Sequence, residues 1–385
     1  MSDAKPKRRP LLTLLVLVGL LLLAVRLLYG GRGKDFPDRS TPPKLPAGAL
    51  ERVAALDEPP GNLAVSAEGR IFFTYHPEAR PEIKLAELVD WGPGKPGKPV
   101  PYPDRAAQAG FATPLGTRID RQGRLWVIDP GFHGVKGARL DAFDLATNRP
   151  LLHHVFSRAD AGIGSFFNDF QVSPDGATVY IADIDIFGKH PALVVFDVAT
   201  RTARRLLEND PSVKEQDWLI RAPGRDMLIL GGLLTLRPAV DSIALDGRGE
   251  WLYYGPMAHT SLFRVRTADL LDRGLSKAEL ARRVETYADK PLTDGLSMDN
   301  DDNVYATDVE HRGIAVIAPD RTLKTLIKDD RVRWADGLSF GPDGWLYIAD
   351  SAIQDHLFKS KGYIREHAPY FLWRFKPGPS GTPGQ

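Results

Sequence analysis

The sequence predicts an all-β fold, namely a six-bladed β-propeller of four-stranded antiparallel blades, preceded by an N-terminal hydrophobic helix. Three observations predict this fold. A hairpin-like segment recurs six times, a further apolar strand follows each copy, and a long apolar run precedes them all. With 385 residues and 43% hydrophobic content, the chain can bury the core of one large domain.

The N-terminal segment has the organisation of an export signal. The apolar run from Leu11 to Leu28 is near the lower length limit of a membrane-spanning helix. Basic residues that we expect to stay in the cytoplasm precede it: Lys5, Lys7, Arg8 and Arg9. No A-x-A cleavage site directly follows the run, which favours an uncleaved anchor over a removed signal peptide. We therefore expect residues 1–29 to be a signal or anchor segment that contacts a membrane. The protein is then extracytoplasmic, membrane-anchored or secreted, in the periplasm or at the cell surface.

The rest of the chain divides by composition into three parts. Residues 30–48 carry many Gly, Pro and charged residues, which predicts a flexible tether. No linker-like stretch divides residues 49–376, so we expect one propeller domain there. Residues 377–385 are predicted to form a disordered tail.

The repeat is clearest where DGLSMDNDDNVYATD (294–308) is aligned with DGLSFGPDGWLYIAD (336–350). Both segments begin and end with Asp and place a turn of Gly, Asp and Asn between two apolar stretches, which is typical of a β-hairpin. The same pattern begins at four earlier positions: Gly61, Leu115, Asn168 and Asp241.

A third strand is predicted after each hairpin. The six segments are KLAELV, LDAFDL, LVVFDV, SLFRVR, GIAVIA and YFLWRF. Fourth strands are expected next, but the chain ends before the last repeat has one. We expect the segment from Leu50 to Leu56 to supply it and to close the ring, because closure removes exposed sheet edges.

Two insertions interrupt the repeat spacing. The larger, residues 217–238, is predicted to form an extra hairpin over one face. The smaller, residues 267–289, is predicted to contain a short surface helix, with Ser276 as its cap and Glu279 as the capping-box partner.

The propeller geometry predicts where the polar repeat positions meet. Residues at the same repeat position are carried to the same height around the central channel. The first position, which is Asp in three repeats, holds Gly61 (with Asn62 next to it), Leu115, Asn168, Asp241, Asp294 and Asp336. The Asp residues that end second strands are expected near the same mouth: Asp129, Asp183, Asp308 and Asp350.

Three interpretations of these carboxylates are open. Oxygens of Asn168, Asp241 and Asp294 are hard ligands that suit Ca²⁺, Mg²⁺ or Mn²⁺. Alternatively, crowding raises carboxyl pKa values, and Asp241, Asp294 and Asp336 include a general acid and a general base. In the third interpretation, the Asp residues at strand ends accept hydrogen bonds from loop N–H groups and only hold the blades together.

Aromatic and amide side chains beside the mouth are candidate ligand contacts. They are Phe166, Phe167, Tyr254, Trp334, Asn62 and Asn168. Four histidines lie just beyond second strands, where an imidazole can move a proton: His76, His133, His259 and His311.

Composition excludes several function classes. Lys and Arg total 50 against 49 for Asp and Glu, which argues against a nucleic-acid partner. The absence of cysteine excludes disulfides, thiolate metal sites and cysteine nucleophiles. The sequence has no G-x-S-x-G, P-loop or HExxH motif, so serine-hydrolase, nucleotide and zinc-protease functions have no support.

Several segments resemble the major royal jelly protein and yellow family, including bacterial members related to dopachrome-converting enzymes. The segments are PGNLAVSAEGRIF, RLWVID, FNDFQVSPDG, AVDSIALDGRGEWLYYGP with SLFRVRTADL, and RWADGLSFGPDGWLYIADS. The resemblance covers nearly all of residues 50–376. It implies a normally secreted six-bladed propeller with a ligand pocket at the central channel. Some relatives bind small aromatic amines, and some are linked to dopachrome conversion. The pocket residues that it implies are Asn168, Asp241, Asp294, Asp336, Phe167 and Tyr254.

The chain is more distantly similar to the gluconolactonase-like superfamily. In that superfamily a divalent ion at the channel is held by acidic and amide side chains and assists lactone hydrolysis. Here the first repeat offers Gly61 and Asn62 and no Glu, which departs from that pattern. Insect relatives of the royal jelly family often carry disulfides, which this chain lacks.

Three function classes follow. The first is an extracytoplasmic small-molecule enzyme, either an isomerase resembling a dopachrome tautomerase or a metal-assisted lactonase. The second is a non-catalytic propeller that sequesters a small aromatic amine or a sugar acid. The third is a scaffold for an envelope protein, which would have a plugged channel and a contiguous apolar patch.

Overall fold

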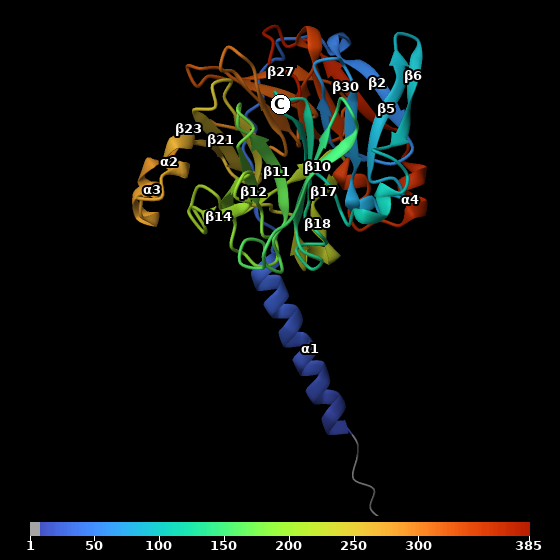
Figure 1. Cartoon of the computed structure of the whole chain (residues 1–385). Helices are drawn as coiled ribbons and strands as arrows, with labels where there is room; N and C mark the ends of the chain where they lie inside the picture. The colour runs from blue at the N-terminus through green and yellow to red at the C-terminus, as the bar shows by residue number, and fades with distance from the viewer. Residues whose placement is uncertain (1–7) are drawn as a thin grey trace, which may run out of the picture.

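The computed structural model describes residues 8–385 and confirms the six-bladed propeller (Figure 1). Six four-stranded antiparallel sheets surround a central channel, and the first strand of each sheet contacts the first strands of its neighbours. These inner strands are buried on both faces, because one side meets the channel and the other the next blade.

The blades follow the predicted repeats. Blade one has β3 (Pro60–Val65), β4 (Ile71–Tyr75), β5 (Leu85–Gly92) and β6 (Lys95–Pro101). Blade two has β7 (Thr117–Ile119), β8 (Arg124–Asp129), β9 (Arg139–Asp144) and β10 (Arg149–Val155). Blade three has β11 (Phe167–Val172), β12 (Thr178–Asp183), β13 (Ala192–Asp197) and β14 (Thr202–Leu206). Blade four has β20 (Val240–Leu245), β21 (Trp251–Pro256), β22 (Ser261–Arg266) and β23 (Glu285–Asp289). Blade five has β24 (Leu296–Met298), β25 (Val304–Asp308), β26 (Gly313–Ile317) and β27 (Leu323–Lys328).

Blade six closes the ring with a strand from the other end of the sequence. It contains β28 (Ala335–Phe340), β29 (Leu346–Asp350), β30 (Tyr370–Phe375) and, outermost, β2 (Glu51–Leu56). Glu51 lies opposite Arg374 and Leu56 opposite Tyr370 in an antiparallel pair. The predicted closure by the segment around Leu50–Leu56 is therefore confirmed.

The larger insertion forms more than the single predicted hairpin. It contains β15 (Trp218–Leu219), β16 (Arg221–Ala222), β17 (Arg225–Asp226), β18 (Leu228–Ile229) and β19 (Leu234–Thr235). Strands β16 and β17 form one hairpin and β18 and β19 another, while β15 pairs in parallel with β1 (Lys34–Asp35). Ile220, Met227 and Ile229 pack with Met257 and Trp334, so the insertion covers one end of the channel.

The short helices lie on the surface of the ring. They are α2 (Thr267–Leu271), α3 (Lys277–Arg283) and α4 (Lys361–Glu366). The predicted capping box of α3, between Ser276 and Glu279, is confirmed. Single 3-10 turns are η1 (Ala47–Ala49), η2 (Pro77–Ala79), η3 (Ala107–Gly110), η4 (Leu230–Gly232), η5 (Pro342–Gly344) and η6 (Ile353–Asp355).

The N-terminal helix α1 (Arg8–Tyr29) projects from one end of the propeller (Figure 1). Its segment Leu12–Tyr29 has a mean hydropathy of 2.5, is not buried against the propeller, and is long and apolar enough to cross a membrane. Lys5 and Lys7 of the predicted basic flank lie outside the described residues.

Residues 30–48, for which the composition predicts a flexible tether, run along the propeller in the structure. Lys34 pairs with Trp218, and the N–H of Leu45 donates to the carbonyl of Leu326. Phe36 and Leu45 pack against two of the apolar clusters. Phe36 and Leu45 thus attach this segment to the propeller, although its overall composition is polar.

The C-terminal residues differ from the predicted disordered tail. The N–H of Ile119 donates to the carbonyl of Gly384, and the N–H of Phe340 donates to the carbonyl of Gln385. The tail therefore closes the channel between the inner strands of blades two and six, at the end away from α1 (Figure 1). Gly384 has a φ of +88°, and a Cβ there would overlap the carbonyl of Ile119, so only glycine fits.

Candidate functional site

A cavity of about 410 Å³ lies at the end of the channel from which α1 emerges. Among its buried polar residues are four that lie at the starts of the inner strands of four blades: Asn168, Asp241, Asp294 and Asp336. Its walls are largely apolar and include Leu115, Phe166, Ile184, Met257 and Ile353. A volume of this size and lining suits one small organic molecule.

Local breaks in strand pairing turn these polar side chains toward the channel. Asp241 is an extra residue between the pairs that Val240 and Ser242 make with β21. Similar shifts occur at Asn168 in blade three and at Asp336 in blade six. A β-bulge of this kind bends the strand and redirects its side chain.

In blade five, the hydroxyl of Thr307 accepts the hydrogen bonds that a backbone carbonyl of the neighbouring strand would otherwise accept. The N–H groups of Asp294 and Gly295 both donate to Thr307 Oγ1, at 2.9 and 3.0 Å. A Cβ on Gly295 would overlap the carbonyl oxygen of Asp336, so glycine allows the neighbouring inner strand to approach. The two carboxylates of blades five and six are brought together by this close approach.

Asp241 and Asp294 form a carboxyl pair. Both side chains are buried, and they share a hydrogen bond across the gap between blades four and five. Asp241 Oδ1 accepts a hydrogen bond from the amide nitrogen of Asn168, and Asp294 Oδ2 accepts one of 2.5 Å from the indole nitrogen of Trp334.

The pKa values of the pair are displaced upward. Burial raises the pKa of Asp294 to about 7, while the hydrogen bond from Trp334 opposes the rise. Burial raises the pKa of Asp241 well above its ordinary value, and the charges of Asp294 and Asp169 raise it further. The pair therefore holds a proton near neutral pH, with Asp294 the first to ionise. Burial and the charge of Asp294 also raise the pKa of Asp336.

An arginine lies deeper in the channel. Arg118 is 1% exposed, and its Nη1 donates to Asn62 Oδ1 at 3.0 Å. The charged atoms of Arg118 and Asp169 lie 3.5 Å apart but without hydrogen-bond geometry. Asn62 Nδ2 donates to Asp169 Oδ1 at 2.8 Å. Burial raises the pKa of Asp169 to about 6, and the Arg118 charge opposes that rise. Asn62, predicted as a ligand contact, instead orients this ion pair below the cavity.

Two other predicted contacts lie in blade cores. Phe167 is fully buried and packs on Phe156, with ring centroids 5.0 Å apart. Tyr254 is also fully buried, and its hydroxyl hydrogen-bonds Ser212 at 2.8 Å. Neither residue lines the cavity. The reason is strand alternation, because the neighbour of a channel-facing residue points into the blade. Trp334 contacts the site through its indole N–H, which donates to Asp294, while its ring packs in an apolar cluster.

The Asp residues that end second strands have a structural role. Asp129 accepts the N–H groups of Ala112 and Thr113, and Asp350 accepts that of Trp334. Asp183 and Asp308 accept loop N–H groups in the same way. For these four residues, the interpretation that strand-end Asp holds loops in place describes the contacts found.

The histidines divide into two groups. His76 and His133 line the cavity, while His259 and His311 are not among its lining residues. His76 lies 4.3 Å from His356, centroid to centroid, and burial lowers the pKa of His76 to about 4, so it is neutral. His356 could be placed only by the structure, because nothing in its local sequence marks it.

The predicted cation ligands Asn168, Asp241 and Asp294 all line the cavity. In the described part of the chain, no three His, Asp, Glu or Cys side chains are grouped as metal ligands. Asp241 and Asp294 are occupied by hydrogen bonds, although the buried Oδ1 of Asn168 has no partner. The oxygen donors suit a hard cation, but the carboxyl pair would have to separate to ligate one. The cation remains a prediction.

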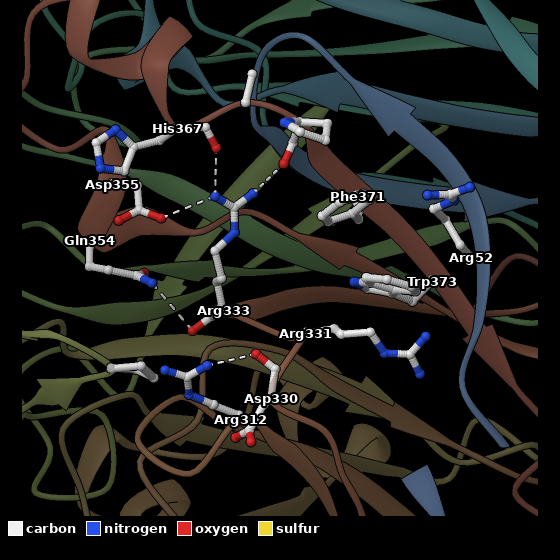
Figure 2. Close-up of a pocket in the computed structure, with 13 residues that line it drawn as sticks. Arg52, Arg312, Asp330, Arg331, Arg333, Gln354, Asp355, His367, Phe371 and Trp373 are labelled. Carbon is white, nitrogen blue, oxygen red and sulfur yellow. Dashed lines mark hydrogen bonds and ion pairs between the residues drawn. The ribbon is translucent and has the colours of Figure 1, made fainter. Parts of the chain in front are cut away.

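A larger hollow of about 810 Å³ on the outer side of blades five and six contains several arginines (Figure 2). Arg333 there is held by Asp355 and by the carbonyls of His367 and Pro369. Arg312 donates to the carbonyl of Asp330. The guanidinium groups of Arg312 and Arg333 are thus already bonded within the protein. The channel cavity is therefore the better candidate site.

Comparison with known proteins identifies relatives of this chain. The family model described as Major royal jelly protein matches residues 112–333, more than half of the chain. Major royal jelly protein 2 of Apis mellifera is 29% identical over 46% of this chain and 41% of its own length. Major royal jelly protein 1 of the same organism is 30% identical over 43% of this chain and 40% of its own length. The chain thus spans less than half the length of these relatives.

Solved structures share the fold. A gluconolactonase from Xanthomonas campestris has a TM-score of 0.53 at 14% identity and covers 90% of this chain and 98% of its own. A calcium-binding regucalcin from Agrobacterium tumefaciens has a TM-score of 0.52 at 15% identity, covering 90% and 100%. A luciferin-regenerating enzyme has a TM-score of 0.56 at 11% identity, covering 87% and 97%. At such identities the likeness shows the propeller fold alone.

Proposed function

The chain belongs to the major royal jelly protein family, and on this premise we propose that it is an extracytoplasmic enzyme that isomerises a small carbonyl compound, in the manner of a tautomerase. The observation that supports this best is the Asp241–Asp294 pair, which shares a hydrogen bond in the cavity. Tautomerisation needs a base and an acid close together, and a carboxyl pair with displaced pKa values supplies both.

The environments of the two carboxyls assign their roles. Trp334 donates to Asp294 and stabilises its anion, so Asp294 is the base. Burial and the neighbouring charges of Asp294 and Asp169 favour the protonated form of Asp241, so Asp241 is the acid. Asp294 removes a proton from the carbon beside the substrate carbonyl, and the C–H electron pair forms the new C=C bond. The carbonyl oxygen takes the proton of Asp241, and the hydrogen bond between the carboxyls returns a proton to Asp241.

The cavity walls suit a ring-bearing substrate. Phe166 and His133 lie with ring centroids 4.8 Å apart on one side of the cavity. Leu115 and Ile184 complete an apolar surface beside them. Such walls exclude water, which strengthens hydrogen bonds from the carboxyl pair to a bound carbonyl.

The location proposed for the enzyme rests on α1. The segment Leu12–Tyr29 is apolar except near its end, where Arg26 lies, and none of it is buried inside the propeller, as expected of a helix in a bilayer. The basic residues before it favour a cytoplasmic N-terminus, which supports a propeller outside the cytoplasm.

The direct test is proton exchange at carbon. Full-length protein in D₂O is incubated with a panel of β-dicarbonyl compounds, α-keto acids and aminochromes, and loss of the α-hydrogen signal is followed by proton NMR. We expect exchange with at least one class, and loss of that exchange in Asp294→Asn and Asp241→Asn. Asp320→Asn, at an exposed turn, is the control and should match the wild type. Exchange that persists in both pair variants would contradict the proposal.

A second candidate is metal-assisted lactone hydrolysis. The buried Asn168 Oδ1 without a partner favours it, as do the described activities of a gluconolactonase and a calcium-binding regucalcin with this fold. Asn168, Asp241 and Asp294 would hold Ca²⁺, Mg²⁺ or Mn²⁺, which when bound would polarise a carbonyl. Calorimetric titration of the chelator-treated protein with each ion tests this. Stoichiometric binding that Asp241→Asn abolishes supports the lactonase, and no binding rejects it.

A third candidate is a binding protein without turnover. The carboxylates could neutralise the charge of a small aromatic amine, and Phe166 could stack on its ring. Saturable binding of aryl amines, with no exchange in any substrate class, would favour sequestration over catalysis.

A further inference from the structure

The last turn of α1 is fixed to the propeller and has no free linker after it. Tyr29 Oη donates to the carbonyl of Phe187 at 2.7 Å, and Arg26 Nη1 donates to the carbonyl of Gly232 at 3.3 Å. The N–H of Gly31 also donates to the carbonyl of Gly232, at 3.1 Å. A Cβ on Gly30 would overlap the carbonyl oxygens of Gly232 and Leu233, so the chain is packed closely on the β18–β19 hairpin.

The same turn forms part of the cavity wall. Leu27, Leu28 and Tyr29 line the cavity together with Phe187 of blade three and Leu234 of the insertion. The helix that would anchor the protein therefore also borders the entrance to its candidate site. The cavity thus lies beside the end of the helix that joins the propeller, and Figure 1 shows the helix projecting from that end.

Exposed apolar side chains gather at this end of the propeller. Of the nine large ones outside α1 in the described chain, six form what we call the apolar rim: Phe132, Val135, Ile163, Phe187, Leu230 and Phe358. Phe187 and Phe358 line the cavity, and Leu230 lies between β18 and β19. The N–H of Gly164 donates to the carbonyl of His133, which joins the loops that carry the other three.

The length of the helix brings the apolar rim to the membrane. The apolar segment has 18 residues, which rise about 27 Å at about 1.5 Å per residue. The hydrocarbon core is about 30 Å thick, so the segment has no excess length. Because Gly30 is already packed on the propeller, a spanning α1 draws the apolar rim into the interface. Lys136 over the ring of Phe132 adds the basic and aromatic pairing that suits lipid headgroups, whereas Lys189 near Tyr29 is already paired with Glu215 at 2.8 Å.

We propose that the apolar rim lies on the bilayer that α1 spans, and that the cavity takes its ligand from that bilayer. The ligand class is an amphipathic molecule with an apolar body, which suits the walls, and one hydrogen-bonding head, which suits the carboxyl pair. The inference has two halves. The ligand half, that the cavity takes its ligand from the bilayer, rests on the proposed function of the cavity. The docking half, that the apolar rim lies on the bilayer, rests only on α1 and the apolar rim.

The absence of cysteine makes the docking half directly measurable. Full-length protein carries a bimane label at Leu230→Cys, Ile163→Cys or Phe358→Cys in phosphatidylcholine vesicles with nitroxide-labelled lipid. Leu271→Cys is the control, because Leu271 is also an exposed apolar residue but lies on α2 at the side of blade four. We expect several-fold stronger quenching at the three rim positions than at Leu271. Equal quenching at all four would overturn the docking half.

The ligand half is tested with 1-pyrenebutanol, an aromatic body with one hydroxyl. Its binding to full-length protein in the same vesicles is followed by energy transfer from tryptophan. We expect saturable transfer that is lost in Leu234→Trp, which fills the half-buried wall, and kept in Leu271→Trp, which adds the same side chain outside the cavity. Transfer that is unsaturable, or unchanged in a folded Leu234→Trp, would overturn the ligand half. Transfer reports ligand binding and proton exchange reports chemistry, so the two failures are distinguishable. Saturable transfer without exchange in the unmodified protein would reject the proposed chemistry, and exchange without saturable transfer would reject membrane access.

Discussion

The indole nitrogen of Trp334 donates a 2.5 Å hydrogen bond to Asp294, and Asp294 shares a further hydrogen bond with Asp241. A residue that leads into blade six thus orients a carboxyl pair from blades four and five. The relationship spans three consecutive blades, so it exists only when their inner strands pack side by side. The acid–base pair is thus a product of blade packing, and it can be altered one residue at a time.

Replacing Trp334 by Phe should raise the pKa of Asp294. The substitution removes the N–H that stabilises the anion and keeps most of the apolar ring. The acidic limb of the exchange rate should move to higher pH, with a lower rate at neutral pH. A rate profile measured from pH 5 to 9 checks this. A limb that moves to lower pH would show that Trp334 does not stabilise the charged form.

The unmodified protein should show exchange that rises as the pH passes through about 7. Burial raises the pKa of Asp294 to about 7, so below that pH the base is protonated and inactive. Asp241 must keep its proton, and burial raises its pKa further, so the rate should fall again at higher pH. A bell-shaped profile is expected, and its limbs report the pair as a unit.

Folding stability should fall as the pH rises from about 4 to about 7. The pKa of Asp294 is higher in the folded chain than in the unfolded chain, so the folded state binds more protons in this window. Raising the pH removes that proton and destabilises the fold, at a cost of the order of a few kcal/mol. Asp294→Asn should flatten this part of the profile. Urea unfolding at pH 5 and pH 7.5 measures the free energy of unfolding of the wild type and of Asp294→Asn. An equal pH dependence in these two proteins would contradict a raised pKa of Asp294 in the folded state.

Removing Arg118 alone should be strongly destabilising. Arg118→Met leaves Asp169 buried without its counter-charge, and breaking a buried pair on one side costs about 3–5 kcal/mol. The double variant Arg118→Met with Asp169→Leu should recover much of that loss, because no buried charge then remains unpaired. The denaturant midpoints of the single and double variants measure how much stability the second substitution restores. A double variant no more stable than the single one would show that the ion pair is not what stabilises the channel.

The C-terminal residues should stabilise the ring. Gly384→Ala places a Cβ against the carbonyl of Ile119 at a φ of +88°, and we expect a loss of about 1–3 kcal/mol. Gly224→Ala is the matched control, since Gly224 has a φ of +80° but open space around it. A larger fall in Tm for Gly384→Ala than for Gly224→Ala is expected. Equal falls would show that the contact with Ile119 adds nothing to the strain of the backbone.

The sequence could predict the ring because each blade repeats one local pattern. The alignment of residues 294–308 with 336–350 carries the hairpin, its turn and both terminal Asp residues. The strand that closes blade six followed from the same pattern, because its last repeat has no fourth strand of its own. The grouping of Asn168, Asp241, Asp294 and Asp336 followed from the ring geometry.

Other parts of the site depend on contacts between distant segments. Phe167 was expected at the mouth, but the bulge at Asn168 turns only the next side chain toward the channel. Strict alternation along the strand would have placed Phe167 in the core. The wall formed by Leu27 and Leu28 depends on Gly30 packing against the β18–β19 hairpin, and neither segment signals the other in sequence.

The central claim is that Asp241 and Asp294 hold one shared proton near neutral pH. Infrared difference spectroscopy of the full-length protein between pH 6 and pH 8 observes the C=O stretch of protonated carboxyl groups directly. We predict a band that titrates near pH 7 in the wild type, that is lost or strongly shifted in both Asp241→Asn and Asp294→Asn, and that is unchanged in Asp320→Asn. No titrating carboxyl band in this range, or one unaffected by both pair variants, would contradict the account.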